Sequence, residues 1–110
     1  MTTPVTIGRI VHFVLPTGDP TPCRPAMVVH VFHNGGIARS YGYPDDTPVA
    51  NVQVFTDGIN DAGPGHEKYA AGLVWETSVV HDPSRKAKTW HWPHECGATH
   101  VRTPAPGPDY

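Results

Sequence analysis

The chain has 110 residues, which is enough for one small domain and too few for two independent cores. Its 13 prolines and 11 glycines leave little room for long helices, and its apolar residues are mainly Val and Ile, so the composition predicts an all-β fold. The formal net charge of −2 argues against binding of duplex nucleic acid. The sequence shows no signal peptide pattern and no membrane span, which predicts synthesis in the cytoplasm and no membrane association.

Five segments have strand character, and each is bounded by Pro, Gly, Asp or Asn. They are Thr6–Leu15, Ala26–Phe32, Ala50–Thr56, Gly72–Val80 and Lys88–Trp92. Apolar residues on both faces of segment 26–32 predict a central strand that is buried on both sides. In the fourth segment we expect alternate residues from Leu73 to Val79 to point inward, with Glu76 and Ser78 pointing outward.

Five strands in an open sheet would leave two exposed edges, so we predict closure into a small barrel. A five-stranded SH3-like barrel over residues 1–93 is favoured, with an OB-type barrel as the alternative. Two long connections, residues 34–49 and 57–71, should project from it and contact partners. Residues 94–110 are rich in proline and are predicted to form an extended C-terminal tail.

Histidine and cysteine gather close to the end of the last predicted strand. His91, His94, Cys96 and His100 offer the donors that Zn²⁺ accepts, within ten residues. In the last strand, however, His91 should point away from the face that carries Trp90 and Trp92. One short stretch would also have to fold back around the ion, so these four are weak candidates. The sequence predicts no bound metal and no cofactor.

Catalysis has little support in the sequence. The three serines form no Gly-x-Ser-x-Gly elbow, and Cys23 lies in a proline-rich turn rather than at a helix N-terminus. Cys23 and Cys96 are predicted to be free thiols. The segment from Asp57 to Asp61 fits a tight turn better than a calcium loop. The chain is therefore predicted not to be an enzyme.

The basic run Arg85–Lys88 leads directly to Trp90 and Trp92. Cations beside aromatic rings suit a nucleotide, with the cations on phosphate and a ring on the base. The alternative is a solvated turn that is followed by two core tryptophans. The predicted partner- or ligand-binding residues are Arg9, Arg24, Arg39, Asp57, Asn60, Arg85, Lys86, Lys88, Trp90 and Trp92, and the predicted tail contacts are Pro104, Pro106, Pro108 and Tyr110.

Four stretches in combination carry a resemblance. They are the opening GRIVHFV of residues 8–14, CRPAMVV of residues 23–29, NVQVFTDG of residues 51–58 and TWHWP of residues 89–93. They resemble a family of short uncharacterised proteins encoded by tailed phages and prophages. The resemblance covers residues 8–93 and implies a viral origin. Members of that family usually end soon after the last stretch, so residues 94–110 are an addition.

The leading functional hypothesis is a non-catalytic virion component, either a capsid decoration or a head-tail accessory protein. Such proteins bind neighbouring subunits of the particle, commonly as homo-oligomers, and extended arms add contacts across subunits. The alternative is a cytoplasmic anti-defence protein that sequesters a nucleotide signal or caps a host protein. A buried pocket with a few cations would suffice for nucleotide binding, so the net charge does not exclude it.

Overall fold

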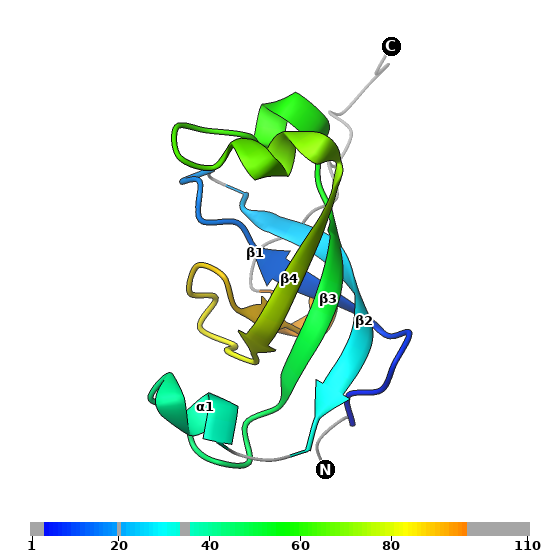
Figure 1. The fold of residues 1–110 in the computed structure, drawn as a ribbon, viewed down its shortest axis with the longest axis vertical. Helices are drawn as coiled ribbons and strands as arrows, with labels where there is room; N and C mark the ends of the chain where they lie inside the picture. The colour runs from blue at the N-terminus through cyan, green and yellow to red at the C-terminus, as the bar shows by residue number, and fades with distance from the viewer. Residues whose placement is uncertain (1–3, 20, 34–35, 97–110) are drawn as a thin grey trace, which may run out of the picture.

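The computed structural model describes residues 4–19, 21–33 and 36–96. Within them the chain forms one five-stranded antiparallel sheet that curls into half a barrel (Figure 1). The strands are β1 (Ile10–Val14), β2 (Cys23–Phe32), β3 (Val49–Phe55), β4 (Leu73–Val80) and β5 (Trp90–His91). The prediction of a mainly β fold is confirmed, and each strand lies on or overlaps a predicted segment.

Four short helical segments occupy the connections. They are α1 (Gly36–Ser40) and the 3-10 turns η1 (Gly58–Asp61), η2 (Glu67–Ala71) and η3 (Pro93–Glu95). The first three lie in the two connections that were predicted as long loops, and η3 lies at the start of the predicted tail. The described residues contain no helix that is both long enough and apolar enough to cross a membrane.

The strand order is β4-β3-β2-β1-β5. The first four strands pair with their neighbours in sequence, and β5 returns to pair with the free edge of β1. A single parallel bridge between His81 and Trp90 also brings the end of β4 next to β5. These contacts explain the curl of the sheet, because the residue after β4, at one edge, contacts β5, at the other edge.

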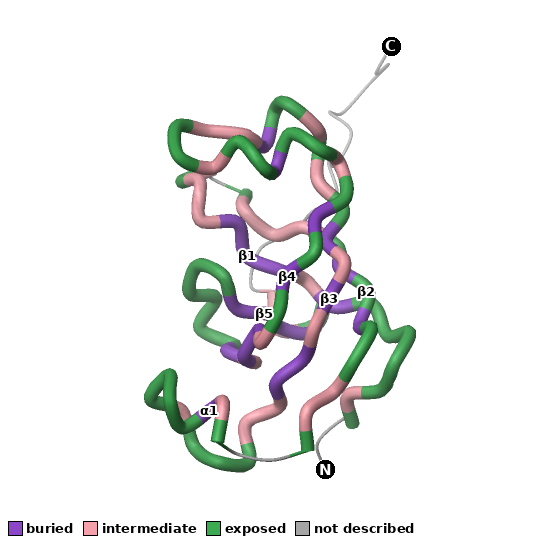
Figure 2. Tube along the Cα trace, in the orientation of Figure 1, coloured by how far each residue is buried: buried purple, intermediate pink, exposed green. Residues whose placement is uncertain are grey.

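The core lies inside the curl of the sheet (Figure 2). It is made mainly of small β-branched and aromatic side chains, including Val11, Phe13, Val28, Val52, Val54, Tyr69 and Trp90, all of which are fully buried. The β-branched residues of β1, β2 and β3 suit a half-buried pleated surface. The aromatic rings fill the space that the small valines leave, which explains why so small a sheet encloses a continuous core.

Strand β2 is buried on one face only. Ala26 and Val28 are fully buried, whereas Met27 and Val29 are each 40% exposed. The strand is central in the sheet, as predicted, but the prediction of burial on both sides is wrong. The outward residues continue across the sheet, since Ile10, Met27, Gln53 and Trp75 pair in one register row.

The predicted facing of β4 is wrong over its first half. Leu73 and Trp75 are 52% and 45% exposed, while Val74 and Glu76 are buried. The buried Glu76 carboxylate accepts a hydrogen bond from the Tyr69 hydroxyl at 2.7 Å and pairs with Lys68 at 2.7 Å, which compensates for its desolvation. An irregularity in the β3–β4 register changes the alternation, so both Val79 and Val80 are buried.

Candidate metal centre

Two histidines and one cysteine meet on the face of the sheet opposite the main core. His12 in β1 pairs directly with His91 in β5, and Val14 in β1 pairs with Cys23 at the start of β2. Paired residues share a face, as do residues two apart in a strand, so all three donor side chains lie on one side. Phe13 and its partner Trp90 point to the other side, into the core.

The turn η3 brings a fourth donor back to this face. Pro93 begins the turn two residues after the end of β5, and the Cys96 backbone N–H donates to the Pro93 carbonyl at 3.2 Å. The Glu95 carboxylate braces it by accepting the Trp92 backbone N–H at 2.8 Å and contacting His81 Nε2 at 2.7 Å. Cys96 therefore faces Cys23 although 73 positions separate them in the sequence.

The four side chains form a compact cluster. One ligand atom from each of His12, Cys23, His91 and Cys96 lies within 4.8 Å of all the others. The Sγ atoms of the two cysteines are 3.4 Å apart, and Cys23 Sγ lies 3.5 Å from His91 Nε2. A disulfide would need an Sγ–Sγ distance of about 2.05 Å, so these are two thiols in contact, which agrees with the prediction of free cysteines.

These distances suit a tetrahedral metal ion. With Zn–S bonds of about 2.3 Å and Zn–N bonds of about 2.05 Å, tetrahedral angles give about 3.8 Å between two sulfurs and about 3.5 Å between sulfur and nitrogen. The observed 3.4 Å and 3.5 Å differ from these values by a few tenths of an ångström at most. Two thiolates would also neutralise the charge of Zn²⁺, as burial requires.

Burial sets the protonation of the cluster in the metal-free state. It raises the pKa of Cys23 to about 11, with the contact to Cys96 adding to the effect. It lowers the pKa of His91 to about 4, with the charges of His12 and Arg85 adding to the effect. His91 is fully buried, and its Nδ1 atom has no hydrogen-bond partner among the described residues. The imidazole is therefore neutral, which is the form that binds metals.

The sequence identified half of this cluster. His91 and Cys96 were weak metal candidates, but His94 instead stacks on Trp92 with ring centroids 6.5 Å apart, and His100 lies outside the described residues. His12 and Cys23 were missed as metal ligands. The sequence carried a signal for His12, because it is a polar residue in an apolar strand and should face away from the core. That His12 lies beside His91 of β5, however, depends on the tertiary fold.

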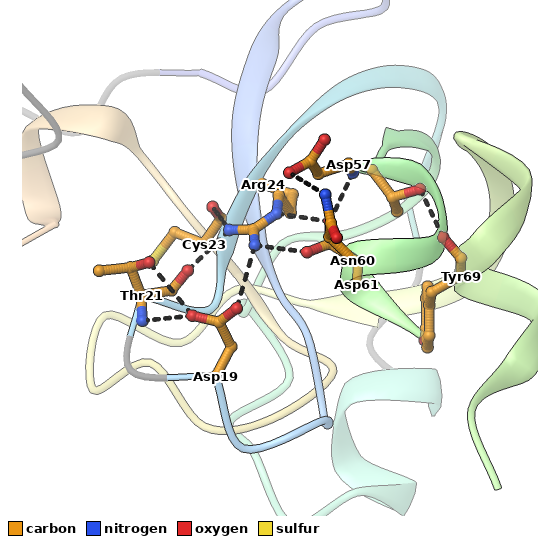
Figure 3. A network of polar contacts seen from close by, with 9 residues as sticks. Asp19, Thr21, Cys23, Arg24, Asp57, Asn60, Asp61 and Tyr69 are labelled. Carbon is orange, nitrogen blue, oxygen red and sulfur yellow. Dashed lines mark hydrogen bonds and ion pairs between the residues drawn. The ribbon is translucent and has the colours of Figure 1, made fainter. Parts of the chain in front are cut away.

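Arg24 holds the cysteine end of β2 in place (Figure 3). Its guanidinium grips the buried Asp61 carboxylate with two hydrogen bonds of 2.6 Å, and it donates to the Cys23 carbonyl at 2.9 Å. The Asp57 backbone N–H donates to the same carboxylate at 2.6 Å. Hydrogen bonds from Arg24 are the main cause of the lowered pKa of Asp61. Arg24, predicted to bind a ligand, thus joins η1 to β2.

The other predicted binding residues do not form one common site. Trp90 and Trp92 are buried in the core, so their rings are not open to a partner. Arg9 lies over the Trp92 ring at 5.0 Å, and Arg39 forms an exposed ion pair with Asp45 at 3.4 Å. The remaining residues, Asp57, Asn60, Arg85, Lys86 and Lys88, are exposed, while Pro104, Pro106, Pro108 and Tyr110 lie outside the described residues.

Comparison with models of known families, with curated proteins and with solved structures finds no match to this chain.

Proposed function

We propose that this protein is a zinc-binding β domain whose metal centre has a structural role. The observation that carries the proposal is the convergence of His12, Cys23, His91 and Cys96 within 4.8 Å. Two cysteines and two histidines around one point are typical of structural zinc sites, in which protein ligands take all four positions. No position would remain for a substrate or a reactive water, which supports binding rather than catalysis.

The role of the ion follows from where its ligands lie. β1, β2, β5 and the residue after η3 each supply one ligand. A single ion would therefore connect the first two strands of the chain to its last strand and to the residue after η3. β5 is only two residues long and pairs with β1 over two residues, which is little to hold the end of the chain. Because metal binding free energy is folding free energy, the ion would stabilise this junction.

Metal analysis of the untagged full-length chain tests the proposal. Protein purified without chelators should contain about one zinc ion per chain, measured by inductively coupled plasma mass spectrometry. The Cys96→Ser and His12→Ala variants should lose most of it. His94→Ala is the matched control, since its ring is exposed and outside the cluster, and it should retain the metal.

Cobalt gives a second readout. Co²⁺ in place of zinc should show thiolate charge-transfer bands that disappear in Cys23→Ser. A zinc content near zero after growth in zinc-supplemented medium would overturn the proposal. Full zinc retention by Cys96→Ser would do the same, because the fourth ligand would then not be Cys96. Another metal at full occupancy would overturn the assignment to zinc.

We also propose that the curled sheet is of the SH3-like type. The meander β1-β2-β3-β4 with β5 added to the edge of β1 supports it, as does the bridge between His81 and Trp90. Backbone amide contacts measured by NMR between residues 80–82 and 90–91 would test whether the two ends close. Their absence in solution would contradict a closed barrel.

The origin of the chain as a phage virion component stays a prediction that depends on the sequence resemblance alone. Mass spectrometry of purified particles should find the chain in many copies per particle. Its absence from particles of a phage that expresses it would remove the prediction and leave the anti-defence alternative. The zinc centre is compatible with either role, so the two experiments are independent.

A further inference from the structure

A groove of the molecule is lined by all three lysines of the chain. It lies between β4, the segment after α1 and the turn that precedes β5, and it has a volume of about 680 Å³. In Figure 1, α1 and the yellow segment of residues 81–89 both lie beside the arrowhead end of β4. The side chains that matter for its chemistry are Lys68, Lys86, Lys88, Tyr41, Tyr43 and Trp75. The volume falls within the range of about 300–1,000 Å³ that is typical of small-molecule sites.

Of the three lysines in the groove, only one is paired with a carboxylate in the described part of the chain. Lys68 is paired with the Glu76 carboxylate at 2.7 Å. Lys86 and Lys88 are exposed, and neither forms an ion pair with a residue in the described part of the chain. In a protein with a net charge of −2, two such ammonium groups on one groove favour an anionic ligand.

Exposed aromatic residues line the same groove. Trp75 is 45% exposed and Tyr41 is 59% exposed, although large rings at such positions gain from burial. An open indole or phenol face beside ammonium groups offers both contacts that a nucleotide needs, a surface on which the base stacks and cations for phosphate. Neither ring comes from the tryptophans that the sequence analysis had assigned to this role.

The walls of the groove are held in place by one buried carboxylate. Asp82 is 7% exposed and accepts hydrogen bonds from the Tyr43 hydroxyl at 2.5 Å and from the Ser84 backbone N–H at 2.8 Å. Its own N–H donates to the Trp90 carbonyl at 2.8 Å. Asp82 thereby connects the segment after α1, the turn of residues 82–89 and β5. The walls of the groove are therefore preorganised for a ligand.

Backbone strain is concentrated at the same place. Ser78, Arg85 and Lys88 have φ of 54°, 63° and 64°, the left-handed region that side chains other than glycine disfavour. Ser78 and Lys88 line the groove. The Lys88 backbone N–H donates to the Val14 carbonyl at 2.8 Å, which holds the strained residue in place. Strain that is maintained by surrounding bonds is common at ligand sites.

We propose that this groove binds a nucleoside diphosphate or a closely related phosphorylated ring. The phosphates contact the ammonium groups of Lys86 and Lys88, and the base stacks on Trp75 or Tyr41. The proposal goes beyond the zinc centre and is independent of it, because none of the four clustered residues lines the groove.

Calorimetry with the full-length chain and ADP, without added Mg²⁺, tests the proposal. We expect saturable one-to-one binding that weakens as NaCl is raised, because screening reduces the lysine–phosphate attraction. Adenosine and inorganic phosphate, titrated separately, should each bind at least about tenfold more weakly than ADP, since each makes only one kind of contact.

The variants assign the contacts. The double variant Lys86→Gln, Lys88→Gln and the variant Trp75→Ala should each weaken ADP binding about tenfold or more. Arg39→Gln is the control, because this exposed cation lies outside the groove and should leave binding unchanged. Thermal unfolding should show that the variants remain folded, as the changed residues are exposed. No ADP binding at millimolar concentration would overturn the proposal.

Two further outcomes would also overturn it. Inorganic phosphate that binds as tightly as ADP would show that the rings take no part and that the groove is an anion site only. Tight binding of a glutamate-rich peptide, with ADP unable to compete, would assign the groove to an acidic protein partner.

Discussion

At the scale of single residues, the most buried ion pair among the described residues is the one between Arg24 and Asp61. The Asp61 side chain is 1% exposed and the Arg24 side chain 17%, so loss of the Asp61 charge leaves a largely buried guanidinium with only the longer contact of 3.4 Å to Asp19. Asp61→Asn should lower the free energy of unfolding at pH 7 by about 3 kcal/mol. Asp57→Asn, an exposed neighbour on the same turn, should change it by less than about 0.5 kcal/mol. Urea unfolding of both variants measures the difference.

The same pair predicts an acid response. The pKa of Asp61 is lowered in the folded state, so the unfolded state binds more protons at acidic pH. The stability that this pair contributes is fully present above the unfolded pKa of about 3.9 and is lost as the pH falls through the lower folded pKa. The acid slope of unfolding free energy should therefore be shallower in Asp61→Asn than in the parent. Equal slopes would show that other carboxylates govern the acid response.

At the scale of elements, β4 illustrates how a bulge overrides alternation. Ser78 adopts φ of 54°, and its backbone N–H donates to Asn51 Oδ1 at 2.8 Å, which secures the irregular register. Ser78→Gly keeps this bond and removes the left-handed strain, so we expect it to stabilise the protein by up to about 1 kcal/mol.

The neighbouring Thr77 provides the comparison. It is exposed on the same strand and does not have positive φ, so Thr77→Gly should destabilise the protein by about 1 kcal/mol. If Ser78 is strained, Ser78→Gly should raise the midpoint of thermal unfolding and Thr77→Gly should lower it. A similar loss in both would show that Ser78 tolerates its conformation without cost.

At the scale of the whole molecule, the proposed zinc ion would secure a short final strand. With zinc bound at a hundredfold excess over its dissociation constant, the stabilisation is about 2.7 kcal/mol. Removal of zinc with EDTA should therefore lower the midpoint of thermal unfolding by about 10 °C, by differential scanning calorimetry. The Cys96→Ser variant should unfold at the same low temperature with or without EDTA. An EDTA effect of equal size in that variant would contradict the assigned centre.

The mainly β fold and the approximate strand positions were predictable from composition and from turn residues. Runs of β-branched residues bounded by Pro, Gly and Asn indicate strands, whichever strands they pair with in the sheet. In β3, Val52 and Val54 share one buried face, as the alternation of apolar and polar residues in this segment indicates, because the pairing of β3 with β2 is regular there. The facing of β4 did not, since the register shift between Glu76 and Val79 breaks the alternation, so residues before and after it follow different phases, and the shift has no local signature in this sequence.

The candidate metal centre and the lysine groove belong to the tertiary structure. His91 and Cys96 lie close together in the sequence, but His12 and Cys23 join them only because β5, the last strand along the chain, pairs with β1, the first. Trp75 likewise comes to lie near Lys86 and Lys88 through the packing of the segment before β5. Local residue preferences decide which segments are strands, whereas contacts between distant positions depend on loop closure and register, to which no short stretch of sequence corresponds.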